Sequence, residues 1–206
     1  MTLALIDYGA GNLRSVENAL RAAGCDDLIV TADTDMVARA DRIVLPGVGA
    51  FGACAQALRG VDGMVEAMTA AVATRGVPFL GICVGMQLLA TQGEEYGVHA
   101  GLDWIGGTVA AMVPTPAAKV PHMGWNDVVP MAAARDHALL RPGEAYFLHG
   151  YRFAVTDPAD VLAVSDHGGP VTAAVTRGTV IGVQFHPEKS QAYGLAFLSR
   201  FLEWRP

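Results

Sequence analysis

Positive charge is scarce in this chain. Lys and Arg together account for 14 of the 206 residues, against 20 Asp plus Glu, so the formal net charge is −6. No cluster of Lys or Arg occurs that would form a nucleic-acid footprint or bind an anionic membrane surface. We therefore expect a protein or a small molecule as the partner, and neither nucleic acid nor a membrane.

Cysteine is also scarce. The three cysteines, at positions 25, 54 and 83, form neither a C-x-x-C metal motif nor an even set that disulfides could pair. This pattern favours a reducing compartment, and we expect a cytoplasmic protein with no bound metal. Cys25 and Cys54 are expected to be packing residues.

Signals for membrane insertion and for cofactors are missing as well. The N-terminal residues lack a basic segment and soon reach Asp7, which is typical of a first strand rather than a signal peptide. No apolar run has the length needed to span a bilayer. The glycines of residues 9–11 lack the third spaced glycine and the Walker lysine of a phosphate loop, and no cofactor is expected.

Hydrophobic residues, by contrast, make up 52% of the chain, enough for one domain with a substantial core. No linker, internal repeat or low-complexity tract divides the sequence, so residues 1–206 are predicted to form a single domain. Strand-like and helix-like segments alternate in the first half, and mostly strand-like segments follow Gly106. The predicted strands are 3–8, 28–31, 42–45, 77–82, 108–113, 145–148, 161–165, 172–176 and 180–185, and the predicted helices are 12–23, 51–58, 64–73 and 192–204.

This order of segments predicts an α/β fold with a mainly parallel central sheet, covered on both faces, and additional antiparallel strands in the second half. In open sheets of this kind, ligands bind beyond the carboxyl ends of the strands. The strand ends before Gly47 and at Ile82 are therefore expected to meet at one rim of the sheet.

The most informative segment is 78–89, PFLGICVGMQLL, in which a strand-like run meets a helix-like run at a glycine-flanked turn. Gly81 and Gly85 are expected to permit a tight, strained turn that lifts Cys83 off the sheet. At the mouth of a helix the sulfur would be favoured as a thiolate, and the N–H of Val84 would be free to bind an oxyanion. Because free cysteines are often buried, the segment alone also fits a core position for Cys83.

A second segment, 180–190, reads VIGVQFHPEKS and ends a strand-like run at His-Pro-Glu. Residues two apart on an extended chain project to the same side, so Glu188 is expected to bind one ring nitrogen of His186 and leave the other for a thiol. With Cys83 this predicts a catalytic triad of nucleophile, base and orienting carboxylate. The alternative is a strand-end histidine and an exposed glutamate that never meet the cysteine.

A third segment, 42–51, reads RIVLPGVGAF and places a Pro-Gly-x-Gly loop after a strand. The glycines on either side of Val48 permit a backbone conformation that points an N–H into a pocket, where it would be a second oxyanion donor beside Val84. Taken alone, the loop is equally typical of an ordinary turn between a strand and a helix.

These three segments and three others together resemble the class I glutamine amidotransferases, in particular the glutaminase subunits of imidazole glycerol phosphate synthase. The resemblance lies in residues 6–13 (IDYGAGNL), 45–51 (LPGVGAF), 80–89 (LGICVGMQLL), 121–126 (PHMGWN), 146–149 (YFLH) and 182–190 (GVQFHPEKS). It covers essentially the whole chain, and the first, second and fourth segments and the trailing Lys-Ser are the ones specific to this subfamily.

The resemblance implies a flavodoxin-like three-layer sandwich and an enzyme of histidine biosynthesis. Such a subunit hydrolyses glutamine to glutamate and ammonia with a Cys-His-Glu triad. It delivers the ammonia to a (β/α)₈-barrel cyclase subunit, its partner in a heterodimer, which makes imidazole glycerol phosphate and an aminoimidazole carboxamide ribonucleotide.

The resemblance also implies further site residues. Gln87, Gly49 and an acidic residue, either Glu94 or Glu95, would contact glutamine, and the residues at or near the subunit interface would be Asn12, Trp125, Tyr146 and Lys189. Gly150 stands where the family frequently has Ser or Thr, which puts a side-chain contact to glutamine there in doubt. His122 and His149 match subfamily motifs but have no carboxylate at triad spacing, and structural or interface roles are predicted for them.

Other functions stay open at this point. The same triad would suit another class I glutaminase, such as the pyridoxal phosphate synthase or anthranilate synthase subunit, although the N-terminal and Trp125 segments count against both. A non-catalytic regulatory subunit is a second alternative, against which the intact Cys83, His186 and Glu188 argue. A self-contained cysteine hydrolase is a third.

Overall fold

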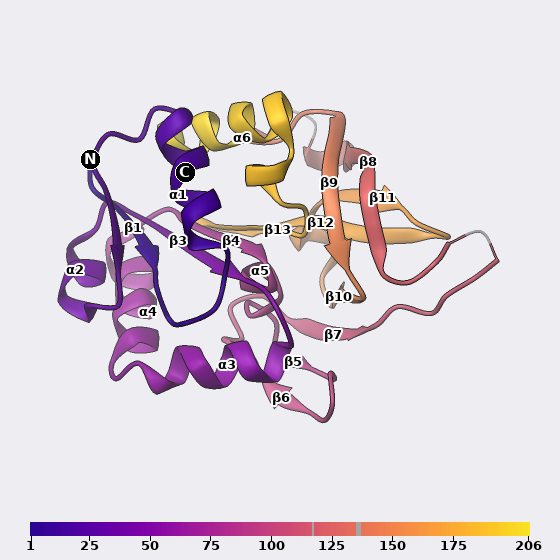
Figure 1. The fold of residues 1–206 in the computed structure, drawn as a ribbon, viewed down its shortest axis with the longest axis horizontal. Coiled ribbons are helices and arrows are strands. Elements are labelled where there is room, and N and C mark those ends of the chain that lie inside the picture. Colours follow the sequence, from indigo (N-terminus) through magenta and orange to yellow (C-terminus); the bar gives the residue numbers. More distant parts are fainter. Residues whose placement is uncertain (117, 135–136) are drawn as a thin grey trace.

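The structure, a computed structural model, describes residues 1–116, 118–134 and 137–206. A nine-stranded sheet runs through the molecule with the strand order β2-β1-β3-β4-β13-β12-β11-β8-β9. Helices cover both faces of its first half, so the three layers of an α/β sandwich are visible in Figure 1. The predicted fold class is confirmed.

Five strands form the parallel half of the sheet. These five pair with one another in parallel, and the residues of β1, β3, β4 and β13 are all buried. Burial on both faces explains why these strands are continuous apolar runs rather than alternating ones. The strands are β1 (Leu3–Ile6), β2 (Leu28–Thr31), β3 (Arg42–Gly47), β4 (Phe79–Cys83) and β13 (Val180–Val183).

The helices lie in two groups on opposite sides of the sheet (Figure 1). One side carries α1 (Leu13–Ala22) and α6 (Gln191–Glu203), and the other carries α2 (Thr34–Arg39), α3 (Phe51–Gly60) and α4 (Met64–Arg75). Among the helices of the described ranges, none combines the length and the apolar character needed to cross a membrane.

The second half of the chain extends the sheet with antiparallel strands, and a smaller four-stranded sheet combines strands from both halves of the chain. The added strands are β8 (His122–Pro130), β9 (Gly143–His149), β11 (Val161–Asp166) and β12 (Pro170–Arg177). The smaller sheet has the order β10-β7-β5-β6 and consists of β5 (Gln92–Gly93), β6 (His99–Ala100), β7 (Gly107–Ala111) and β10 (Tyr151–Val155). The chain passes from the large sheet to the small one at Gly150.

Some elements differ from the sequence prediction. Strand β13 ends at Val183 rather than at 185, so that the following residues leave the sheet. Helix α2 and strands β5, β6, β8 and β10 were not predicted. The helix has fewer than two turns, too short to show a period. In β8 the polar and glycine residues obscure the alternation that its buried and exposed positions nevertheless follow.

The backbones of β3, β4 and the short helix α5 (Val84–Gln87) lie almost in contact. A Cβ atom on Gly81 would lie 2.6 Å from the Gly85 carbonyl oxygen, and a Cβ atom on Gly85 would collide with the carbonyl oxygen of Leu45. Neither glycine has a positive φ. They are needed for this close approach and not for an unusual backbone conformation.

Replacing Gly85 tests this constraint. Gly85→Ala should lower the free energy of unfolding by about 1–3 kcal/mol or more, because the obstructing atom belongs to the backbone and cannot swing away. Gly60→Ala is the matched control, since nothing lies within 4 Å of its added Cβ. The control should leave stability unchanged or raise it by about 0.4–1 kcal/mol. Urea denaturation measures both, and equal free energies for the two variants would contradict the packing argument.

Candidate active site

A cavity of about 320 Å³ lies at the carboxyl ends of β3 and β4. This is the rim at which the sequence predicted that strand ends would meet. The residues lining the cavity include ten that the sequence singled out: Val48, Gly49, Cys83, Val84, Gln87, Glu95, His149, Gly150, His186 and Lys189.

Cys83 ends β4 in a strained conformation. Its φ is 55° and its ψ is −112°, in a region that residues with a Cβ rarely adopt. The sequence placed this strain at the flanking glycines, but the structure places it at the cysteine itself. The residue is only 4% exposed, yet its sulfur faces the cavity. A strand-to-helix turn of this kind presents a nucleophile.

Helix α5 is a single turn, so few peptide dipoles add up behind Cys83. The partial positive charge at its N-terminus is correspondingly small. Stabilisation of a thiolate must therefore come mainly from side chains that contact the sulfur.

His186 and Glu188 form a buried pair. The distance from His186 Nδ1 to Glu188 Oε1 is 2.8 Å, and their side chains are 4% and 2% exposed. The pairing was predicted, but the extended geometry given for it is wrong, because Pro187–Lys189 is a 3₁₀ turn. Since the carboxylate accepts this bond, Nδ1 carries the proton and Nε2 is left for the thiol side.

The surroundings of His186 favour its charged form. Burial lowers the pKa of the imidazole, but hydrogen bonds with Cys83 and Glu188 and the charges of both raise it to about 10. The second carboxylate oxygen, Glu188 Oε2, is buried and has no hydrogen-bond partner among the described residues. The negative charge of Glu188 is thus directed to the imidazole, which is an imidazolium at neutral pH.

The loop after β3 forms the opposite wall of the cavity. Gly49 has a φ of +98°, which a residue with a Cβ rarely adopts, and Val48 is 43% exposed. The Val48 carbonyl accepts a hydrogen bond from Cys54 Sγ at 3.3 Å, and the hydroxyl of Tyr8 donates to the Pro46 carbonyl at 2.8 Å. These bonds tie the loop to its buried surroundings.

Glu95 lines the cavity, whereas Glu94 is exposed outside it. The Glu95 carboxylate accepts a hydrogen bond from the backbone N–H of Phe51 at 2.7 Å, at the N-terminus of α3. Of the two acidic residues between which the sequence could not decide, Glu95 is therefore the one that lies at the cavity.

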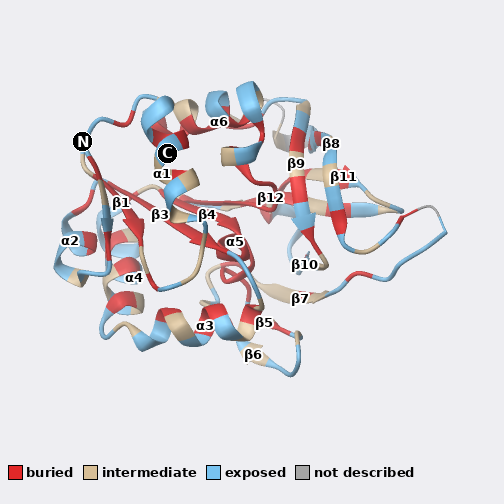
Figure 2. Cartoon of the chain, viewed as in Figure 1, coloured by how far each residue is buried: buried red, intermediate tan, exposed pale blue. Residues whose placement is uncertain are grey.

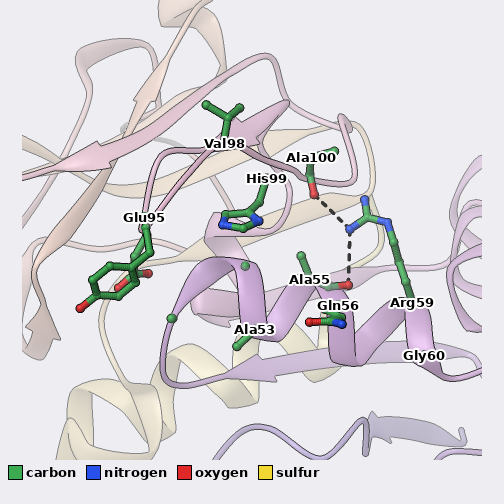
Figure 3. A pocket seen from close by; sticks show the side chains of 12 residues that line it. Ala53, Ala55, Gln56, Arg59, Gly60, Glu95, Val98, His99 and Ala100 are labelled. Atoms are coloured by element: carbon green, nitrogen blue, oxygen red, sulfur yellow. Dashed lines mark hydrogen bonds between the residues drawn. The ribbon is translucent and has the colours of Figure 1, made fainter.

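A second and larger hollow, of about 850 Å³, lies on the other side of Glu95 between α3 and residues 95–100 (Figure 3). Arg59 lines this hollow, and its guanidinium group donates hydrogen bonds to the carbonyls of Ala100 at 3.0 Å and Gly101 at 2.7 Å. The described residues that line this hollow include neither a cysteine nor His186, so they lack the reactive groups of the smaller cavity.

The predicted interface residues lie beside the cavity, apart from Asn12. The rings of Trp125 and Tyr146 meet edge to face at 6.1 Å, and Lys189 Nζ lies 5.9 Å from the centre of the Tyr146 ring. Asn12 is exposed at the start of α1, a helix that packs against the 3₁₀ turn after His186.

His122 and His149 face inward from β8 and β9. His122 Nδ1 and His149 Nε2 are 3.0 Å apart, and both residues are buried. Burial, reinforced by the neighbouring histidines, lowers the pKa of His122 to about 3 and that of His149 to about 4. Both rings are therefore neutral at physiological pH.

Gln184 is the residue near the sulfur that the sequence analysis passed over. It is fully buried, and its Nε2 lies 3.7 Å from Cys83 Sγ. Its place two residues before His186 was the available signal, but an amide has no distinctive chemistry that would single it out.

The neutral histidines generate a prediction on pH. In the unfolded chain both histidines regain an ordinary pKa of about 6.5. Between the folded and unfolded pKa values, the unfolded chain therefore binds protons that the folded protein does not bind. The contribution of these histidines to the free energy of unfolding should therefore be fully present above about pH 6.5. It should fall as the pH decreases toward about 4, at up to about 1.4 kcal/mol per pH unit for each histidine. Urea denaturation from pH 7 to 4.5 should show a shallower loss in His122→Asn. Parallel curves for this variant and the wild type would contradict the assignment.

Comparison with known proteins identifies relatives along the whole chain. The family model described as glutamine amidotransferase class-I matches residues 4–203. The chain is 62% identical to the imidazole glycerol phosphate synthase subunit HisH of Zymomonas mobilis, with all of this chain and 97% of the relative covered. It is 54% identical to the subunit of the same name from Rhodospirillum rubrum, with both chains fully covered.

Solved structures show the same fold. A crystal structure of a glutamine amidotransferase matches with a TM-score of 0.74 at 18% identity, and 98% of each chain is covered. PurLQS from Thermotoga maritima matches with a TM-score of 0.70 at 19% identity, with 98% of this chain and 95% of that chain covered. With relatives this similar along its full length, the chain belongs to the class I glutamine amidotransferase family and, within it, to the HisH subunits of imidazole glycerol phosphate synthase.

Proposed function

We propose that this chain is the glutaminase subunit of imidazole glycerol phosphate synthase in histidine biosynthesis, with Cys83, His186 and Glu188 as its catalytic triad. One observation carries the proposal. A cysteine held in a strained turn faces the same cavity as a buried histidine whose Nδ1 lies 2.8 Å from a buried carboxylate. Family membership supports glutamine as the substrate.

The mechanism follows from the charges of these groups. The Cys83 thiolate attacks the side-chain amide carbon of glutamine, and the N–H groups of Val84 and Val48 bind the oxyanion that develops. The imidazolium of His186 gives its proton to the departing nitrogen, so that ammonia leaves and a thioester remains. Neutral His186 then accepts a proton from the water that attacks the thioester, and glutamate and the thiolate are released.

Glutamine would lie along the wall formed by Gln87, Gly49 and Glu95, all of which line the cavity. A cavity of about 320 Å³ is within the range of small-molecule sites. Gly150 brings no side chain to this wall, although a Cβ there would meet only Val120 at 3.6 Å. The substrate contacts at this position are therefore left to the backbone.

The partner would dock on the surface beside the cavity. On β8 and β9, residues that pair across the strands share an outer face, and the large apolar side chains of that face are exposed by 65% (Met123), 46% (Trp125) and 37% (Leu148). Figure 2 shows how these strands differ from the buried centre of the sheet. Tyr146 and Lys189 continue the surface to the cavity.

We propose a (β/α)₈-barrel cyclase subunit as the occupant of this surface, with Asn12, Trp125, Tyr146 and Lys189 at or near the contact. Exposed aromatic and apolar side chains next to a cavity are typical of an interface that must exclude water around a transferred product. Ammonia would pass to the cyclase, which uses it to make imidazole glycerol phosphate and the aminoimidazole carboxamide ribonucleotide.

The proposal includes one domain and a cytoplasmic location. A single hydrophobic core contains residues from both halves of the chain, which supports one domain over residues 1–206. The three cysteines are free and buried, as suits a reducing compartment.

Removal of the nucleophile is the first test. In the assembled synthase, Cys83→Ala should abolish glutamine-dependent synthesis, because no thioester can form, while ammonium salts still support the cyclase reaction. Both rates are followed by formation of the imidazole product. Cys25→Ala is the control thiol and should retain glutamine-dependent activity, because Cys25 does not line the cavity. Loss of both activities in Cys83→Ala would mean that the cysteine is structural.

The second test separates the other triad members. His186 transfers protons in both half-reactions, whereas Glu188 orients and stabilises the imidazolium, so Glu188→Gln should cost less than His186→Ala. Because members of a catalytic unit are strongly non-additive, the double variant should be within about threefold of His186→Ala. Steady-state kcat/KM for glutamine, with saturating partner and acceptor, measures these losses. Additive losses would show that the two residues do not act as one unit.

A further inference from the structure

The amide of Gln184 lies between the catalytic sulfur and the amide of Gln87. Gln184 Nε2 donates to Cys83 Sγ at 3.7 Å, and Gln184 Oε1 accepts from Gln87 Nε2 at 3.0 Å. Both glutamines are buried, so each amide has only these few partners. Which end of Gln184 faces the sulfur depends on what its other end must bind.

Gln87 determines that orientation. Its Nε2 also donates to the backbone carbonyl of Tyr151 at 3.2 Å, and a carbonyl oxygen can only accept. The NH₂ group of Gln87 must therefore face both Tyr151 and Gln184. The atom of Gln184 that meets it has to be the oxygen, which leaves the NH₂ group of Gln184 for Cys83.

His149 fixes the carbonyl on which this order depends. The Tyr151 carbonyl accepts a second hydrogen bond from His149 Nδ1 at 2.8 Å, so Nδ1 carries the proton of that ring. His149 Nε2 is consequently an acceptor, and it receives the Nδ1–H of His122 at 3.0 Å. His122 Nε2 in turn accepts from Asn126 Nδ2 at 3.0 Å. These bonds form a hydrogen-bonded row from Gln184 through Gln87, the Tyr151 carbonyl, His149 and His122 to Asn126, in which each donor and acceptor is thus assigned.

The hydrogen bonds of this row require His149 and His122 to be neutral. A charged His149 would have a proton on Nε2 and would repel the Nδ1–H of His122. The low pKa values of both rings, which burial causes, keep these acceptors available at neutral pH.

We propose that Gln184 is a further catalytic residue, which donates a hydrogen bond to the Cys83 thiolate, and that Gln87, His149 and His122 are positioning residues that hold its amide in the donating orientation. The inference rests on the proposed function, since it assumes that Cys83 is the nucleophile. A donor favours the anionic sulfur, whereas a reversed amide would present an oxygen lone pair to it and disfavour the thiolate.

Alkylation of Cys83 by iodoacetamide tests the proposal without glutamine or a partner. The second-order rate constant is measured on the acidic limb of its pH profile, where it follows the thiolate fraction, and Cys83→Ala protein corrects for the two other cysteines. Gln184→Met retains most of the volume but has no donor, and we expect its rate constant to fall about tenfold. Unfolding midpoints are recorded for every variant.

A matched pair at His149 tests the positioning role. Asn can place its NH₂ group near the position of Nδ1, so His149→Asn should keep the bond to Tyr151 and alkylate within about twofold of wild type. Gln places its amide near the position of Nε2, so His149→Gln loses that bond and should alkylate at least about threefold more slowly. Both variants lose the imidazole, so a purely structural role would affect them alike.

The outcomes separate the two proposals. A wild-type rate in Gln184→Met, or equal losses in the two His149 variants that follow their unfolding midpoints, overturns the inference alone. If Cys83 of the wild type does not react faster than Cys25 and Cys54, the nucleophile assignment fails and the proposed function fails with it.

Discussion

The near-contact of three backbones at Gly85 is the constraint on which the site depends. Because α5 packs directly against the carbonyl of Leu45, the chain has to turn sharply at the end of β4, and the residue at the turn adopts a positive φ. That residue is Cys83, whose side chain is thereby directed into the cavity instead of the core. The strain at the cysteine is held in place by the surrounding sheet, which is buried on both faces.

Two buried histidines, His186 and His149, line the cavity with this cysteine, and their neighbours shift their pKa values in opposite directions. His186 is held between a carboxylate and the sulfur, and its interactions with these two groups raise its pKa despite burial. His149 has a carbonyl and another imidazole as neighbours, so burial dominates and its pKa falls. One cavity thus contains a protonated imidazole and a neutral imidazole that makes fixed hydrogen bonds, from the same residue type.

Strand β9 connects the proposed triad to the proposed docking surface. The backbone N–H of His186 donates to the carbonyl of Tyr146, and the N–H of Tyr146 donates to Ser190 Oγ, both at 2.9 Å. β9 is an edge strand, and through these bonds its backbone groups at Tyr146 are satisfied by the segment that contains His186 and Ser190. A partner resting on Trp125 and Tyr146 would therefore contact the strand that supports His186.

Local patterns were sufficient to predict the α/β fold and to single out Cys83, His186 and Glu188, because apolar runs, glycine-flanked turns and short motifs are read from neighbouring residues. They did not reveal the 3₁₀ turn at Glu188, the position of Glu95 in the cavity, or the contact of Gln184 with the sulfur. These depend on partners far apart in the chain, such as Gln184 and Cys83, separated by 101 residues, or Gln87 and Tyr151, separated by 64. The direction of a hydrogen bond is set by what each neighbour can donate or accept, and only the tertiary structure brings those neighbours together.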